Sequence, residues 1–378
     1  AGFLACRSNE ELREALATGR DARGNKYDSQ DYYHELLRVV YRIIFLLMAE
    51  DRGLLFDKAR NQDGEAAANF ERYMRYYSIS RIRELSRKIR GTRHVDLWRQ
   101  LSLVFRCFNE GKPDLGLPQL DSALFSESFT PILQRCTLEN IDLLAAVREL
   151  THTRKNNVRQ RVDYRNLGAE EIGSVYELLL EQRPEVDTRS RRRSGSFYLQ
   201  TTAGNERKTT GSYYTPTSLV NSLIETALEP TLKETLEGAN DVAERERRLL
   251  GMKVCDPACG SGHFLVGAAR RLGKRLANIR TGDDELAEPT PADLREAIRD
   301  VVANCIYGVD LNEMAVELCK FSLWLETMEP GKALMFLDHR IRCGNSLVGA
   351  TQRQLDGIDK GNPSDVVPDG AFTPLEGD

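Results

Sequence analysis

The chain has 378 residues, of which 41% are hydrophobic and 29% are charged, and this balance excludes a disordered or fibrous protein. Its 53 basic and 57 acidic residues leave a formal net charge of −4, so contact with nucleic acid would need local basic patches. No apolar run reaches the roughly 18 residues that span a bilayer, and the eight cysteines form no CxxC pair. We therefore expect a cytoplasmic protein with reduced thiols, no membrane segment and no metal site.

The first half of the chain is predicted to be mostly helical. Apolar residues recur at helical spacing within 31–55, and that helix is apolar on most sides, so we expect it to be buried. Further helices are predicted near 66–89, 141–152 and 170–182, with a loop at 111–118 and no strand before residue 190. Residues 1–188 are interpreted as a helical N-terminal domain.

A basic, serine-rich stretch follows and is predicted to be a linker over 189–207. Such a run is often a solvated surface, but its cations would also suit DNA phosphates. The candidate phosphate contacts are Arg189, Arg191, Arg192 and Arg193.

The remaining segment, 208–378, alternates helices with strands. Helices are predicted over 217–228, 230–250 (with a weak point at Gly238), 263–278, 291–304 (capped by Thr290) and 313–328. Short strands are predicted over 252–255, 305–309 and 340–343. This order predicts an α/β fold with a parallel, Rossmann-like sheet that has helices on both faces.

The string DPACGSG at 256–262 lies between a predicted strand and a predicted helix. Gly260 and Gly262 lack a Cβ, so their backbone can approach a ligand and adopt positive φ. The N–H groups and dipole at the start of the next helix favour a carboxylate or phosphate. A tight turn without a ligand is the alternative, but the whole string is more specific than a glycine turn alone.

Two polar residues follow the next two strands. Asp310 can accept hydrogen bonds from two ribose hydroxyls, as acids do in nucleotide-binding sheets, or it can simply favour the dipole of the following helix. Asn345 has a side-chain oxygen that can accept from an exocyclic amine, although a plain turn would also explain it.

A fourth string, KTTGSYYTP at 208–216, precedes these three. The four strings resemble motifs X, I, II and III of the gamma class of N6-adenine DNA methyltransferases, in that order. The resemblance implies S-adenosyl-L-methionine as cofactor and double-stranded DNA as partner. It also implies that Asp256 binds the cofactor's ammonium group, that Asp310 binds the ribose and that Leu311 flanks the adenine. The cofactor-binding residues implied are Tyr213, Tyr214, Thr215, Asp256, Pro257, Ala258, Gly260, Gly262, Phe264, Asp310, Leu311, Asn345 and Ser346.

Two strings in the first half extend the resemblance. FLLMAEDRGLL at 45–55 and GSVYELL at 173–179 are similar to the helical region that precedes this domain in large bacterial methylases. These are the type IIG restriction–modification enzymes and the methylases of the BREX and DISARM phage-defence systems. The resemblance implies site-specific DNA methylation within a restriction or phage-defence system.

The catalytic tetrapeptide of that family, Asn/Asp-Pro-Pro-Tyr/Phe, does not occur in the sequence, and Asn362-Pro363-Ser364 lacks its second proline and its aromatic ring. The first residue is not methionine, so we expect the chain to be part of a longer protein. We expect it to bind cofactor, to transfer no methyl group by itself, and to rely on a second polypeptide or a C-terminal half for catalysis and target recognition.

Other functions remain open at this point. Glu206-Arg207-Lys208 has the spacing of a nuclease motif, and Cys259 with His263 could suggest a metal or thiol site, but both strings adjoin the motifs described above. A protein or RNA methyltransferase would use a similar cofactor half. A catalytically inactive scaffold subunit is the alternative from a different class.

Overall fold

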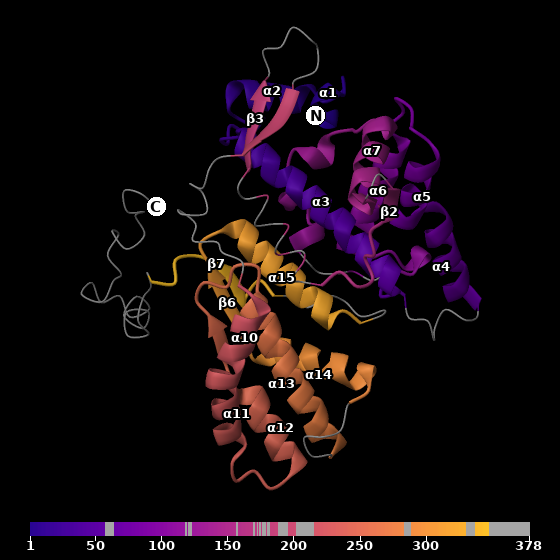
Figure 1. Cartoon of the computed structure of the whole chain (residues 1–378). Helices are drawn as coiled ribbons and strands as arrows, with labels where there is room; N and C mark the ends of the chain where they lie inside the picture. Colours follow the sequence, from indigo (N-terminus) through magenta and orange to yellow (C-terminus); the bar gives the residue numbers. More distant parts are fainter. Residues whose placement is uncertain are drawn as a thin grey trace. The chain divides into compact units, whose positions relative to one another are not determined.

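The computed structural model describes residues 1–56, 64–117, 119, 123–155, 158–168, 171, 173, 175, 179, 182–187, 196–201, 215–282, 289–329 and 337–347. The chain forms two compact units (Figure 1). The first contains the described residues of 1–168, 181–203 and 328–336, and the second those of 169–180, 204–327 and 337–378. No helix in the described ranges is long and apolar enough to cross a membrane.

The first unit is built around the long helix α3 (Ser29–Arg52), drawn in indigo in Figure 1. Asp28 caps its start by accepting hydrogen bonds from the backbone of Gln30 and Asp31, and Gly53 ends it in the left-handed conformation with φ 66°. Most of its apolar residues are buried, as the periodicity predicts, whereas Leu36, Val40 and Ile44 are half-buried. The other helices are α1 (Gly2–Ala5), α2 (Glu10–Thr18), α4 (Gly64–Tyr76), α5 (Ile79–Lys88), α6 (Asp96–Glu110) and α7 (Asn140–Thr151).

Two half-buried acids at the end of α3, Glu50 and Asp51, form hydrogen bonds or ion pairs with neighbouring helices. Glu50 accepts hydrogen bonds from the backbone N–H groups of Ile79 and Ser80, each at 2.8 Å, and from the hydroxyl of Tyr73. Asp51 forms a two-pronged ion pair with Arg83 at 2.8 Å. The acids of the FLLMAEDRGLL string therefore join α3 to α5.

The first unit departs from the sequence prediction in several places. The predicted helix over 66–89 is two helices, because Ser78 caps a new start by accepting from the Arg81 N–H. Helix α6 was not predicted. The prediction of no strand before residue 190 is wrong, since β1 (His152–Lys155), β2 (Val158–Arg161) and β3 (Gln182–Asp187) all precede it, and β1 pairs antiparallel with β2. Strand β3 pairs antiparallel with β4 (Ser196–Thr201), so the stretch predicted as a linker over 189–207 contains a strand.

The second unit follows the predicted order of helices and strands. Its helices are α10 (Thr217–Leu223), α11 (Glu229–Leu236), α12 (Val242–Gly251), α13 (His263–Thr281), α14 (Pro291–Asn304) and α15 (Glu313–Thr327). A π-helical segment, Ile224–Leu228, joins α10 to α11. The predicted weak point is confirmed, because α11 ends at Leu236 and Gly238 has φ 73°. Thr290 caps α14 as predicted by accepting from the Asp293 N–H.

Three parallel strands form the sheet of this unit in the order β5 (Val254–Asp256), β6 (Ile306–Asp310), β7 (Ile341–Cys343). Ile306, Gly308 and Ile341 are buried, and a Cβ built on Gly308 would stand 2.8 Å from Leu265 of α13, so this face is covered by helices. On the opposite face Cys255 is exposed. The expectation of helices on both faces is therefore not met within the described ranges.

Candidate functional site

The candidate site lies at the carboxyl edge of the parallel sheet. Asp256 is the last residue of β5, Asp310 is the last residue of β6, and Gly344 to Ser346 follow β7. A hydrogen bond of 2.9 Å from Gly344 N to Asp310 O extends the β6–β7 pairing to that edge. Strand ends that are remote in the sequence are thus brought together, as the parallel arrangement requires.

The turn 257–262 is fixed by backbone hydrogen bonds. Cys259 N donates to Val309 O at 2.9 Å and so attaches the turn to β6. Gly262 N donates to Cys259 O at 2.8 Å and closes the turn before α13 begins. These bonds hold the turn against the neighbouring strand at the point where that strand ends in Asp310.

The two glycines of the turn have different roles. Gly260 has φ 52°, and a Cβ built on it would meet no atom within 4 Å, so its exposed side is open to a ligand. Gly262 has φ 90°, and a Cβ there would stand 2.9 Å from the sulfur of Cys319. Gly260 therefore presents bare backbone to the site, whereas Gly262 permits close packing on α15.

Helix α13 begins at the turn without a side-chain cap. Its N-cap residue is Gly262, and its first turn contains no acidic residue. By contrast, α14 is capped by the hydroxyl of Thr290. The partial positive charge at the start of α13 therefore faces the site without an acidic side chain to neutralise it, which suits an anionic group of a ligand.

Asp310 connects the glycine turn to the following loop. Its Oδ2 accepts a 2.8 Å hydrogen bond from Gly260 N, and its Oδ1 accepts one of 2.8 Å from Asn312 N. A carboxylate has about four acceptor positions, so each oxygen can still accept a hydroxyl of a ligand. Asp310 can therefore hold the turn and bind a diol at the same time.

Asp256 is half-buried beside Asp310, and its environment disfavours a second negative charge. Burial raises the pKa of Asp256, a hydrogen bond from Ala258 N at 3.0 Å lowers it, and the charge of Asp310 raises it again. A cationic ligand group placed between the two carboxylates would relieve this repulsion and favour ionised Asp256.

The rim of the site carries the remaining predicted residues. The Leu311 side chain is 65% exposed, so it offers apolar surface that a flat aromatic ligand could cover. Asn345 Oδ1 accepts from Leu347 N at 2.9 Å, and Ser346 is exposed. Pro257 and Ala258 are exposed in the turn, and Phe264 is half-buried in the first turn of α13.

The motif that resembles motif X is described only at its end. Thr215 is half-buried and precedes α10, which packs closely on α13, because a Cβ on Gly267 would stand 2.7 Å from Val220. Tyr213, Tyr214 and the four linker arginines, Arg189, Arg191, Arg192 and Arg193, lie outside the described residues.

One part of the site was missed in the sequence. Gly173 is helical and buried, and a Cβ on it would stand 2.7 Å from His263 Cε1 and 2.8 Å from Ser261 Oγ. Gly173 therefore packs on the glycine turn and on the start of α13. A glycine in a stretch of predicted helix was the available signal, since glycine there usually has a packing reason.

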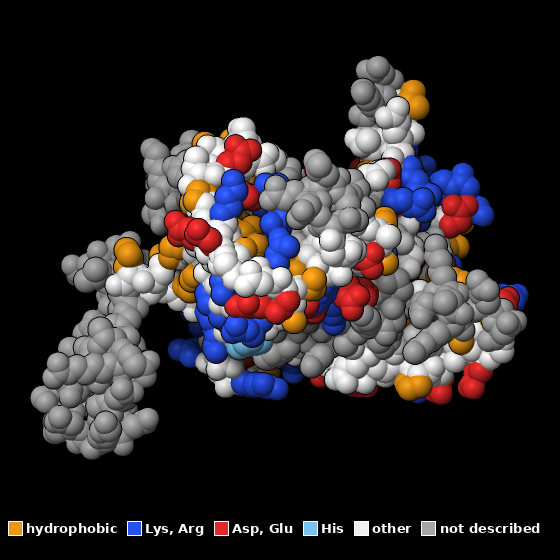
Figure 2. Space-filling model, turned by 90° about the horizontal axis from the view of Figure 1, so that it is seen from below, with side chains coloured by type: hydrophobic (Ala, Val, Ile, Leu, Met, Phe, Trp, Pro, Cys, Tyr) orange, Lys and Arg blue, Asp and Glu red, His pale blue; other side chains and the backbone are white. Residues whose placement is uncertain are grey.

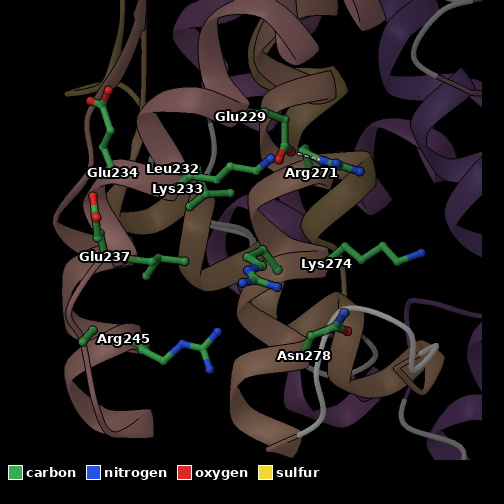
Figure 3. Close-up of a pocket in the computed structure, with 12 residues that line it drawn as sticks. Glu229, Leu232, Lys233, Glu234, Glu237, Arg245, Arg271, Lys274 and Asn278 are labelled. Atoms are coloured by element: carbon green, nitrogen blue, oxygen red, sulfur yellow. Dashed lines mark hydrogen bonds and ion pairs between the residues drawn. The ribbon is translucent and has the colours of Figure 1, made fainter.

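The larger cavities of the second unit lie along its helices. A cavity of about 710 Å³ lies between α11, α12 and α13 (Figure 3), and Arg271 pairs with Glu229 at its rim. None of the predicted cofactor residues lines it, and its walls carry both signs of charge. On the face seen in Figure 2, Lys and Arg side chains likewise lie beside Asp and Glu. A second cavity of about 300 Å³ between α10 and α13 reaches His263, next to the glycine turn.

Residues 194–360 match the model of a family described as N-6 DNA Methylase. A putative type II restriction enzyme and methyltransferase, RM.MjaORFECS2P of Methanocaldococcus jannaschii, is 28% identical over 183 residues, which cover 38% of this chain and 15% of that protein. The type II restriction enzyme and methyltransferase RM.Eco57I of Escherichia coli is 28% identical over 210 residues, which cover 52% of this chain and 19% of that protein.

A third relative is the adenine-specific methyltransferase PglX of Streptomyces coelicolor, 34% identical over 93 residues, which cover 25% of this chain and 7% of PglX. Among solved structures, the type IIL restriction-modification enzyme MmeI in complex with DNA aligns with a TM-score of 0.52 and 17% identity, covering 96% of this chain and 42% of that one. That likeness shows a shared fold. The chain thus spans only a minor part of the length of the proteins it resembles.

Proposed function

We propose that this chain, whose residues 194–360 match the N-6 DNA methylase family, binds S-adenosyl-L-methionine for methylation of the N6 amine of adenine in double-stranded DNA. The observation that carries the proposal is the convergence of Asp256, the open backbone at Gly260 and Asp310 at one sheet edge. We further propose that the whole protein serves a restriction–modification or phage-defence system, since two relatives carry restriction enzyme in their names.

The chemistry of the site matches this cofactor. S-adenosyl-L-methionine supplies a methyl group on a sulfonium centre and carries an ammonium group, so it brings positive charge to two neighbouring carboxylates. In our proposal Asp256 pairs with the ammonium group, and Asp310 accepts the ribose hydroxyls through its remaining lone pairs. The backbone at Ala258 to Gly262 and the start of α13 face the methionine carboxylate.

The other end of the cofactor would lie along the rim. Leu311 would cover one face of the adenine, and Asn345 would accept from its exocyclic amine with the lone pair that Leu347 N leaves free. Tyr213, Tyr214 and Thr215 are proposed to fold over the methionine part, and Pro257, Phe264 and Ser346 to complete the walls. Arg189, Arg191, Arg192 and Arg193 are proposed as DNA phosphate contacts.

The base-binding step needs residues of another kind. Holding a flipped adenine costs a few kcal/mol, and the enzymes that do so bind the base in a shaped pocket. The sequence contains no Asn/Asp-Pro-Pro-aromatic string. We propose that a second polypeptide, or further sequence of the same protein, supplies this pocket and the target-recognition surface.

A calorimetric titration of the 378-residue chain with S-adenosyl-L-methionine tests the proposal. We expect saturable binding and, at about 100 times the dissociation constant, stabilisation of the fold by roughly 2.7 kcal/mol. ATP is a matched control, because it shares the adenosine but places anionic phosphates near Asp256 and Asp310, and we expect it to bind more weakly. An absence of binding would favour the inactive scaffold.

A second assay addresses transfer. With cofactor labelled in its methyl group, we expect no incorporation into DNA by the chain alone. Incorporation into RNA or protein instead of DNA would redirect the proposal to another substrate class. Clear turnover on DNA would show that the chain itself contains the base pocket.

A further inference from the structure

Gly173, which lies far upstream in the sequence, packs on the glycine turn. Gly173 is buried in a helical stretch of the second unit, and a Cβ built on it would stand 2.7 Å from His263 Cε1 and 2.8 Å from Ser261 Oγ. A Cβ at residue 173 would displace the ends of the His263 and Ser261 side chains, so glycine lets these two side chains lie directly against the backbone of residue 173.

Of the two side chains that Gly173 contacts, Ser261 belongs to the turn and His263 is the first residue of α13. Ser261 is 8% exposed, and its hydroxyl lies 3.0 Å from His263 Nδ1. Ser261 stands between Gly260 and Gly262, the two residues of the turn with positive φ. The Ser261–His263 pair therefore links Gly173 to the two glycines of the turn.

The other side of the turn is also supported. A Cβ on Gly262 would stand 2.9 Å from Cys319 Sγ and 3.3 Å from Cys319 Cα, so α15 lies directly against this residue. The turn is thus in contact with α15 at Gly262 and with Gly173 at Ser261, and the adjoining His263 also contacts Gly173. Two glycines would otherwise leave the turn many conformations, and restricting them before binding lowers the entropy lost when a ligand is held.

We propose that Gly173 is a positioning residue for cofactor binding, acting through Ser261 and His263 to hold the turn in its binding conformation. The inference rests on the proposed function, because the ligand in question is S-adenosyl-L-methionine. Gly173 itself touches no ligand in this proposal. It acts through its close contact with Ser261 and His263.

The decisive variant is Gly173→Ala in the 378-residue chain, compared with Gly251→Ala. Gly251 also lies in a helix, at the end of α12, and a Cβ on it would meet no atom within 4 Å. We expect Gly173→Ala to raise the dissociation constant for S-adenosyl-L-methionine at least tenfold and to speed amide hydrogen exchange at 258–262 in the ligand-free protein. Gly251→Ala should change neither.

A second variant, His263→Ala, removes the nearest atom of the contact and allows a double-mutant cycle. Because both substitutions act through one contact, the double variant should bind no more weakly than Gly173→Ala alone. Should Gly173→Ala fail to fold, His263→Ala decides by itself, with an expected severalfold loss of affinity.

The possible results are distinguishable. If the unmodified chain does not bind the cofactor, the proposed function fails. If it binds and Gly173→Ala binds equally well, or lowers only the ligand-free melting temperature, the positioning role is overturned. Fully additive losses in the cycle would show that Gly173 and His263 act separately, which also contradicts the proposal.

Discussion

Asp310 has two tasks at the sheet edge, which makes it the most informative single residue. Its two oxygens accept from Gly260 N and Asn312 N, both at 2.8 Å. In Asp310→Asn one oxygen becomes an NH₂ group facing an N–H donor. We expect about 1–3 kcal/mol loss of stability in urea unfolding and at least tenfold weaker cofactor binding by calorimetry. The exposed Asp293→Asn at the start of α14 is the control and should retain affinity; equal affinity in both variants would contradict the ribose assignment.

Glu35 gives the first unit a predictable response to pH. It is 2% exposed and accepts from Leu133 N at 2.7 Å, and burial raises its pKa from 4.5 to about 6 despite the backbone hydrogen bonds. Between these values the folded chain binds more protons than the unfolded chain, so stability falls as pH rises. We expect Glu35 to contribute about 2 kcal/mol to this decrease, and Glu35→Gln to remove it.

The measurement is the free energy of unfolding at pH 4.5 and pH 7 for both proteins. The stability difference, wild type minus Glu35→Gln, should be larger at pH 4.5. The exposed Glu10→Gln provides the comparison for an ordinary surface carboxylate. Parallel pH profiles for wild type and Glu35→Gln would show that Glu35 does not titrate differently in the fold.

At the scale of elements, predictability followed the strength of local signals. Helix α14 has the predicted bounds, 291–304, because Thr290 and Pro291 mark its start and its apolar residues are regularly spaced. The β1–β2 hairpin was missed because its strands, HTRK and VRQR, have no apolar alternation. Helix α6 had a usable signal, since Leu97, Leu101, Val104 and Phe108 form one buried face.

The same contrast holds for the candidate site. Asp256, the glycine turn and Asp310 could be placed together from the sequence, because a strand–turn–helix string fixes them locally and parallel strands align their ends. The packing of Gly173 on Ser261 and His263 could not, since it joins segments far apart in the sequence and depends on a missing side chain. The family resemblance drawn from these strings is confirmed by the match over 194–360.

Helices α13 and α14 cross closely at Gly273. A Cβ there would stand 3.0 Å from the Cα of Ile298, so the backbone of α14 would have to move. Alanine favours a helix over glycine by about 1 kcal/mol. We expect the clash to outweigh this gain, with Gly273→Ala destabilised by about 1–3 kcal/mol in urea unfolding. Gly251→Ala, at the end of α12 with open space at its Cβ, should be neutral or stabilised by up to about 1 kcal/mol. A stabilised Gly273→Ala would contradict this close crossing.

For the molecule as a whole, the edge of the sheet at β5 supports the proposed partner or further segment. Among the described residues β5 pairs with β6 alone, so one side of β5 presents unpaired backbone groups, which natural sheets usually cover. Cys255 lies in the middle of β5 and is exposed, whereas Cys259, Cys305 and Cys319 of the same unit are buried. An added strand beside β5, or a layer on the uncovered face, would bury Cys255.

Thiol labelling can therefore test whether the proposed partner or further segment covers this edge of the sheet. In the 378-residue chain we expect a maleimide to modify Cys255 and Cys343, the two exposed cysteines of the described ranges, ahead of the buried ones. When the proposed segment or partner that carries the base pocket is added, we expect two changes at once. Cys255 should become protected from the maleimide, and methyl transfer to DNA should appear. Both are expected because one added layer would pair with β5 and also bring the adenine to the cofactor. A Cys255→Ser chain separates the chemical label from function and should support the same transfer. Transfer that appears while Cys255 stays fully reactive would place the catalytic segment elsewhere than beside β5.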